Sequence, residues 1–208
     1  MKFWLLIIGL MTAEAYDPNS PHSHNGILQS IDSAPQPVEL NPAQVAQLER
    51  GEVVLQQRLD DSGGGGVAVQ YISATEKSVW STILSYHRYK DWVDNVVSCE
   101  MYDRRGDDIY VEMISSIMGF KVGLYTKNHL RKDQQYMSWT LDYQRESDVD
   151  DMIGYWRVEQ IQESPPITRV DYRTEMKVSG VPSFVANYLT KDALVSGTQW
   201  VKKQAEAR

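Results

Sequence analysis

The side chains that most often carry out proton transfer or nucleophilic attack are scattered along this sequence rather than paired. Histidine is the commonest general acid or base, but His87 is expected on the exposed side of a short helix and His129 on the outward face of a strand. Cys99 is the single cysteine of the chain, which excludes an intramolecular disulfide. Its place at the start of an expected strand is typical of a small buried apolar residue. These patterns favour a protein that is not an enzyme.

Two segments contain residue types that bind metal ions. His22 and His24 form an H-x-H pair in a Pro-rich segment, but two ligands on a flexible segment make a weak metal site. Residues 145–151 are strongly acidic, and their spacing does not match a calcium-binding loop. A solvated acidic loop is the better interpretation. We therefore expect neither a metal site nor a cofactor.

Binding of a small molecule is better supported, because apolar residues recur on one face of several expected strands. Three polar side chains interrupt these apolar faces: Thr126, Asn128 and Thr174. A mostly apolar lining with a few polar groups that orient the ligand is usual for a small-molecule pocket. The same three side chains could instead be satisfied by one another or by water. Both alternatives are open from the sequence.

Turn residues divide the chain after residue 51 into short segments with a period of two. Residues 121–131 alternate between an apolar and a polar face, which is typical of an antiparallel strand with one covered side. The four glycines at 63–66 are expected in a hairpin loop, because no Gly-Lys-Ser/Thr follows to complete a phosphate loop. The expected strands are 52–60, 67–73, 96–104, 108–118, 121–131, 135–143, 152–162 and 168–178.

Helices are expected at three places around these strands. A short helix is predicted at 42–50, and residues 72–98 should leave a strand, form two short helices with Thr75 as the first N-cap, and enter the next strand. Residues 182–205 predict one long helix that covers the sheet. Its inner face is small in the middle, at Ala193, Ser196 and Gly197. There are two alternatives. Either these small residues leave an empty space between helix and sheet, or large strand side chains such as Trp139 or Trp156 fill that space.

The amino terminus and the charge limit location and partners. Lys2, an apolar run at 3–11 and small residues before position 16 predict a signal peptide cleaved after Ala15, and hence export to the periplasm or out of the cell. Residues 16–42 contain five prolines and predict a flexible tether, and 43–208 form one domain. A net charge of −7 gives no counterion-release affinity for nucleic acid. A nucleic-acid partner is therefore not expected.

The order of these elements and two local motifs resemble a known superfamily. A strand, two short helices, a run of antiparallel strands and a long final helix follow the order of the helix-grip fold. Residues 72–80 with 89–92 and 96–98 are similar to its strand, helix pair, Trp and second strand, and residues 154–158 (GYWRV) resemble its Gly-x-Trp strand. The chain thus resembles the START-like (SRPBCC) superfamily, which includes lipid carriers, quinone-binding proteins, plant allergens, polyketide cyclases and aromatase-like enzymes.

This resemblance implies an α+β fold with a hydrophobic pocket between a curved antiparallel sheet and the long carboxy-terminal helix. The expected function is non-catalytic binding or transport of a hydrophobic small molecule, such as a lipid, an isoprenoid or a polycyclic aromatic. Two alternatives are a cyclase or dehydratase acting on a polyketide-like substrate, and a cavity-free protein that binds envelope partners. Transient membrane contact is a further interaction of such a carrier, and the sequence does not define the oligomeric state. The expected ligand-binding residues are Trp92, Leu124, Asn128, Trp139, Trp156, Tyr172, Thr174, Met176, Phe184 and Leu189.

Overall fold

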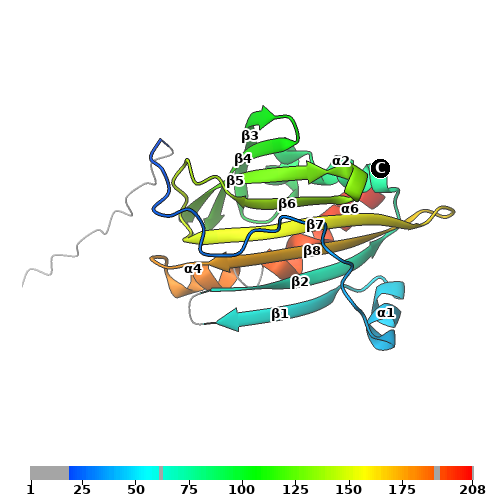
Figure 1. Cartoon of the computed structure of the whole chain (residues 1–208). Helices are drawn as coiled ribbons and strands as arrows, with labels where there is room; N and C mark the ends of the chain where they lie inside the picture. Colours follow the sequence, from blue (N-terminus) through cyan, green and yellow to red (C-terminus); the bar gives the residue numbers. More distant parts are fainter. Residues whose placement is uncertain (1–18, 61–62, 190–192, 208) are drawn as a thin grey trace, which may run out of the picture.

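The fold is built on one eight-stranded antiparallel sheet (Figure 1). A computed structural model of the chain describes residues 19–60, 63–189 and 193–207; the predicted signal peptide lies outside these residues. The strands lie in the order β1-β2-β8-β7-β6-β5-β4-β3, so the first two strands pair with the last one. Their bounds are β1 Val54–Asp60, β2 Gly63–Ile72, β3 Val96–Arg105, β4 Asp108–Ile117, β5 Phe120–Arg131, β6 Tyr136–Leu141, β7 Asp151–Gln162 and β8 Ile167–Lys177. All eight predicted strands are present, and the predicted fold class is confirmed.

The glycine run was expected in a loop, but residues 63–66 belong to strand β2. Close backbone approach explains why these residues are glycines. A Cβ atom on Gly65 would lie 2.4 Å from the Thr174 carbonyl oxygen, and one on Gly66 would lie 2.8 Å from Leu194 Cδ2 in the covering helix. The run therefore lets β8 and the carboxy-terminal helices approach β2 closely.

Two short helices follow β2, as predicted. Helix α2 (Glu76–Ile83) begins at Thr75, whose side chain accepts a hydrogen bond from the Ser78 amide at 3.2 Å. A 3₁₀ turn, η1 (Tyr86–Arg88), then leads into the single-turn helix α3 (Tyr89–Trp92). A second 3₁₀ turn, η2 (Lys132–Gln134), joins β5 to β6. The pair α2 and α3 closes one part of the concave side of the sheet.

The carboxy-terminal segment covers the rest of the concave side, but not as the uninterrupted helix expected over 182–205. The described residues form α4 (Ser183–Asn187), α5 (Ala193–Gly197) and α6 (Gln199–Glu206). Thr198 separates α5 from α6, and residues 190–192 lie outside the description. No helix among the described residues is long and apolar enough to cross a membrane.

The main core lies between the concave face and these helices. It contains strand residues such as Val158 and Val170 together with Val79, Val185 and Val201 from the helices, all with no exposed surface. A second, small cluster of Leu48, Val54 and Val69 lies under α1 (Pro42–Glu49). Helix α1 begins with a capping box between Asn41 and Gln44.

Residues 19–40, called the strap below, cross the convex face of the sheet without forming a helix or strand. Figure 1 shows this blue segment in front of β7 and β8, while α6 lies behind them. The Asp151 carboxylate accepts hydrogen bonds from the Ile27 and Leu28 amides at 2.5 and 2.7 Å. Asp171 accepts from the Val38 amide at 2.9 Å. We expected a flexible tether here; the described part is instead held along the sheet by these bonds.

Candidate ligand pocket

A cavity of about 160 Å³ lies between the concave face of the sheet and the helices. Strands β3 to β8 form its floor, and residues between 86 and 96 lie on one side. The other side is closed by Tyr188, Leu189, Ser196, Gly197 and Trp200. The lining is mostly aromatic and aliphatic. A cavity of this composition, with few polar groups, is suited to an apolar ligand.

Eight of the ten predicted site residues line this cavity. Most of them come from β5 to β8, where the alternation of side chains in the sequence gives the inward face correctly. The eight residues are Leu124, Asn128, Trp139, Trp156, Tyr172, Thr174, Met176 and Leu189.

Trp92 and Phe184 lie elsewhere, which corrects the prediction for both. Trp92 stacks on Trp200 with ring centroids 6.3 Å apart, and Trp200 is the residue that reaches the cavity. Phe184 is 37% exposed and packs edge-to-face on Phe120, with a centroid distance of 5.4 Å. Both belong to helices of five residues or fewer. Helices this short give no repeat from which the buried face can be predicted.

Aromatic rings form one wall and occupy part of the space beneath the helices. The Tyr172 ring lies 4.2 Å from the Trp156 ring and 5.7 Å from the Trp139 ring, measured between centroids. It also fits against Gly197, where an added Cβ would lie 2.6 Å from Tyr172 Cε1. The small residues of the final helices therefore do two things. Gly197 accommodates a strand side chain, as one alternative expected, while Ser196 still borders open space.

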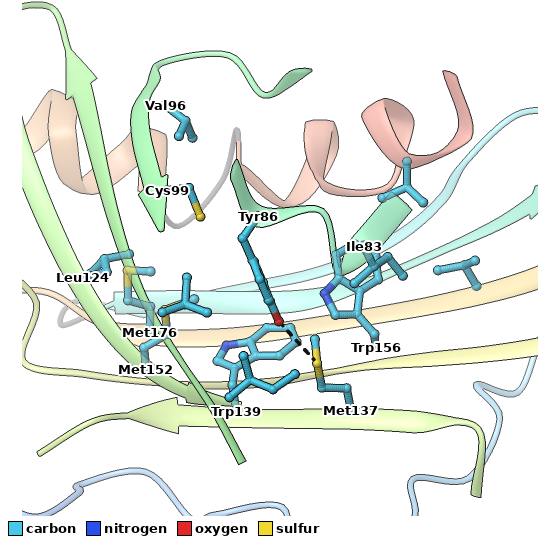
Figure 2. Packing of buried hydrophobic residues seen from close by; sticks show 14 of the residues in the cluster. Ile83, Tyr86, Val96, Cys99, Leu124, Met137, Trp139, Met152, Trp156 and Met176 are labelled. Carbon is cyan, nitrogen blue, oxygen red and sulfur yellow. Dashed lines mark hydrogen bonds between the residues drawn. The ribbon is translucent and has the colours of Figure 1, made fainter. Parts of the chain in front are cut away.

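Sulfur-containing side chains contribute much of the remaining lining. Four methionines line the cavity together with Cys99: Met113, Met137, Met152 and Met176. Figure 2 shows Met152 and Met176 beside Leu124, with Cys99 above them. Methionine side chains are flexible and polarisable, so they adapt to ligands of different shape. Sequence reasoning missed Met113, although the period of two on β4, with Val111 and Ser115, was the available signal.

Three buried tyrosines and the cysteine of the cavity lining are held in their neutral forms. Burial raises the pKa of Tyr86, Tyr89 and Cys99 well above their ordinary values. Tyr86 donates a hydrogen bond to Met137 Sδ at 3.6 Å (Figure 2), and Tyr89 donates to the Ile83 carbonyl at 2.5 Å. Burial also raises the pKa of Tyr172 to about 12. None of these groups exchanges protons readily near neutral pH.

The polar lining residues divide into satisfied and unsatisfied groups. Asn128 donates to the Ile109 carbonyl at 3.2 Å and to Thr126 Oγ1 at 3.0 Å, so these two predicted polar residues are satisfied within the protein. In contrast, Trp139 Nε1 and Thr174 Oγ1 are buried, and no residue in the described part of the chain hydrogen-bonds to either atom. The Thr174 hydroxyl offsets part of the rise in the Tyr172 pKa, but its geometry falls short of a hydrogen bond.

The histidines and acidic residues considered from the sequence lie outside the cavity. His129 faces the convex side and its Nδ1 is 2.5 Å from Asp108 Oδ1. His22 and His24 lie in the strap beside Tyr143. The acidic loop is not simply solvated: Asp151 has no exposed surface, and Asp148 accepts the Gly123 amide at 2.7 Å. Among the described residues, no group of three or more His, Cys, Asp or Glu could hold a metal ion.

The curved sheet, the helices across its concave face and the apolar cavity between them define a helix-grip protein with a hydrophobic pocket. Residues 72–194 match the family model described as polyketide cyclase / dehydrase and lipid transport. Because this match spans more than half of the chain, the chain belongs to that family. No curated protein matches the sequence significantly.

Solved structures share the fold at low sequence identity. A START superfamily protein from Mycobacterium smegmatis aligns with a TM-score of 0.57 and 14% identity, covering 69% of this chain and 97% of its own. A fragment of a STAR-related lipid transfer protein from Xanthomonas axonopodis aligns with a TM-score of 0.55 and 12% identity, covering 74% and 92%. The Zhui aromatase/cyclase from Streptomyces sp. R1128 gives 0.50 and 14%, covering 73% and 84%. These similarities establish the fold.

Proposed function

We propose that this protein binds and carries a hydrophobic small molecule in the cavity without transforming it. The observation that carries the proposal is the lining. Asp94 is the one carboxylate among the described lining residues, it is exposed, and His, Lys and Arg are absent from that lining. The buried phenols and the thiol of Cys99 stay protonated because their pKa values are raised. A general acid or base would need a pKa near the working pH.

The size of the cavity bears on the ligand. An engineered apolar cavity of ~150 Å³ in another protein holds one benzene ring, whereas drug-sized ligands need roughly 300–1,000 Å³. The cavity of about 160 Å³ therefore accommodates a ring-sized group as it stands. A lipid, an isoprenoid or a polycyclic aromatic is larger. Binding one would require the lining methionine side chains to move, or part of the ligand to extend out of the cavity. Burying ~100 Å² of apolar ligand surface contributes roughly 2.5 kcal/mol before ordering costs.

The two alternative functions are less well supported. A cyclase or dehydratase would need an ionisable group directed at its substrate, and the buried lining offers only hydroxyl, thiol, amide and indole groups in neutral form. The other alternative, a protein without a cavity that binds envelope partners, is less well supported because the interior contains a cavity.

Filling the cavity tests the proposal. Val111 is buried and lines the cavity, so Val111→Phe should occupy the ligand's space. Val97 is 47% exposed on the neighbouring strand and provides the matched control, Val97→Phe. Native mass spectrometry of protein purified from its own host should detect a bound hydrophobic molecule in the wild type and the control, and at least tenfold less in Val111→Phe. Wild-type protein that carries no such molecule and binds no apolar fluorescent probe would contradict the proposal.

We also propose that the protein acts outside the cytoplasm, where a carrier would meet a membrane surface transiently. Support comes from the charged residue, the apolar run and the small residues of positions 1–15. Amino-terminal sequencing of the mature protein should give Tyr16 as the first residue, and cell fractionation should recover it outside the cytoplasm. Recovery of the full chain from the cytoplasm would contradict this.

A further inference from the structure

We propose that the ligand carries a carbonyl oxygen, which accepts a hydrogen bond from the Trp139 indole N–H and a second from the Thr174 hydroxyl. The inference rests on the proposed binding function and narrows its ligand class. It starts from two buried polar atoms of the cavity lining, Trp139 Nε1 and Thr174 Oγ1, that have no hydrogen-bond partner among the described residues. Trp139 is 6% exposed and Thr174 is 5% exposed.

The sheet register brings these two side chains to the same place. Trp139 on β6 is directly opposite Gly154 on β7, and Gly154 is opposite Thr174 on β8. Because Gly154 has no side chain, the indole lies over it: a Cβ there would be 2.2 Å from Trp139 Cζ2. The indole thus extends toward Thr174 across the missing side chain. In Figure 2 the Trp139 nitrogen is turned to the side of the cavity where Met152 and Met176 lie.

The chemistry of the two groups restricts what they can bind. An indole N–H is a donor only, so its partner must be an acceptor, and a hydroxyl donates as well as accepts. A carbonyl oxygen has two lone pairs and can receive both hydrogen bonds. A pure hydrocarbon would leave both groups unsatisfied in an apolar cavity, which is unfavourable. A compact apolar molecule with a ketone, quinone or ester carbonyl fits both the lining and the volume.

The rest of the molecule provides matched controls. Within the part of the chain that the structure describes, Trp80 Nε1 and Thr198 Oγ1 are also buried without a hydrogen-bond partner, and neither residue lines the cavity. Trp80 is 3% exposed and Thr198 has no exposed surface. Trp80→Phe therefore removes an indole N–H, and Thr198→Val removes a threonine hydroxyl, from positions that are similarly buried but lie outside the cavity lining.

The experiment compares 1-indanone with indane, which have the same fused ring system but differ by one carbonyl. Neither compound reacts readily with a thiol, so Cys99 does not interfere. Dissociation constants of the full chain are measured by calorimetry, with urea unfolding to verify that each variant is folded. The readout is the ratio of ketone to hydrocarbon affinity, because an enlarged cavity in Trp139→Phe would affect both probes alike.

We expect the wild type, Trp80→Phe and Thr198→Val to share one ratio that favours the ketone. Trp139→Phe should lower this ratio about five- to tenfold, and Thr174→Val about threefold or more, since each removes one buried hydrogen bond. If Trp139→Phe does not fold, the affinity ratio of the near-isosteric variant Thr174→Val alone tests the carbonyl inference. An unchanged ratio with indane still bound overturns the carbonyl inference and leaves the carrier function standing. Failure of both probes to bind the wild type overturns both.

Discussion

The two faces of the sheet differ in the side chains they present and in what covers them. The concave face presents aromatic rings and thioethers, and its closure by helices leaves a cavity unfilled. The convex face has more charged side chains, including the pairs Lys127–Asp108 and Arg173–Glu175. The chain's own strap crosses this face and is held by the carboxylates of Asp151 and Asp171. The concave face is therefore available to a small-molecule ligand, whereas the strap already covers part of the convex face.

The strength of the contacts differs in the same way. Hydrophobic packing on the concave face is non-directional, so methionines can rearrange without losing much energy. On the convex face, charge-assisted hydrogen bonds fix particular strap amides to particular oxygens. Arg169 adds to this by bonding both Asp171 and the Val38 carbonyl, at 2.7 and 2.6 Å. The convex face therefore supplies rigidity, and the concave face supplies adaptability.

The largest effect is expected from removing the Asp151 carboxylate on the convex face. Asp151→Ala leaves the amides of Ile27, Leu28 and Met152 and the Tyr143 hydroxyl without their acceptor. Several hydrogen bonds to a buried charge are lost, so the free energy of unfolding should fall by about 3–5 kcal/mol in urea titrations.

The neighbouring Asp150 provides the control for that variant. Its side chain accepts an exposed hydrogen bond from Ser179, so Asp150→Ala should cost less than about 1 kcal/mol. Ligand affinity of folded Asp151→Ala should stay within about twofold of wild type, because the cavity lies on the other face. Equal stability losses in the two variants would show that the strap is not held by Asp151.

The sequence predicts the concave face far better than the convex one, for a physical reason. Side chains in a strand alternate with a period of two, so Leu124, Trp139 and Thr174 could be placed in the cavity from the pattern alone. Trp92 and Phe184 could not, because one turn of helix gives no period. The strap contacts join residues far apart in sequence, as between Leu28 and Asp151. Nothing local distinguishes Asp151, which is buried, from the other carboxylates of its loop.

The next effect tests how closely the concave face is packed at Gly197. Glycine to alanine within a helix usually stabilises a protein by about 0.5–1 kcal/mol. Here the new Cβ would lie 2.6 Å from Tyr172 Cε1, and the Tyr172 ring is held by Trp156 on another side. Gly197→Ala should therefore destabilise the protein by about 1–3 kcal/mol in urea and weaken ligand binding as the ring is pushed into the cavity.

A double-mutant cycle identifies the cause of that loss. Tyr172→Leu removes the ring that the new Cβ contacts, so Gly197→Ala should cost at least 1 kcal/mol less in the Tyr172→Leu background. Additive effects would instead place the cost in the backbone of α5 and contradict the described packing of Tyr172 on Gly197.

The smallest effect is a pH dependence that belongs to the convex face alone. Burial by itself would raise the pKa of Asp151, but the hydrogen bonds from Leu28, Tyr143, Ile27 and Met152 outweigh it and hold the pKa below its ordinary value. A depressed pKa in the folded state means that the carboxylate contributes its full stability above the unfolded pKa of about 3.9. That contribution is lost as the pH falls through the folded pKa.

The variant Asp151→Asn is the reference for this contribution, because its side chain has nearly the same shape but does not titrate. It replaces one of the two accepting oxygens with an NH2 donor, so its constant cost includes that lost acceptor as well as the lost charge. The difference in unfolding free energy between wild type and Asp151→Asn should be constant, at about 1–2 kcal/mol, from pH 8 to pH 5. Below about pH 4 this difference should decrease progressively, because Asp151 becomes protonated in the unfolded chain while it is still ionised in the folded protein. For Asp108, burial would raise the pKa, but the hydrogen bonds and charges of His129 and Lys127 together outweigh it and lower the pKa. This effect is common to both proteins and cancels. A difference that stays constant down to pH 2 would mean that the strap is held by the geometry of the Asp151 site and not by its charge.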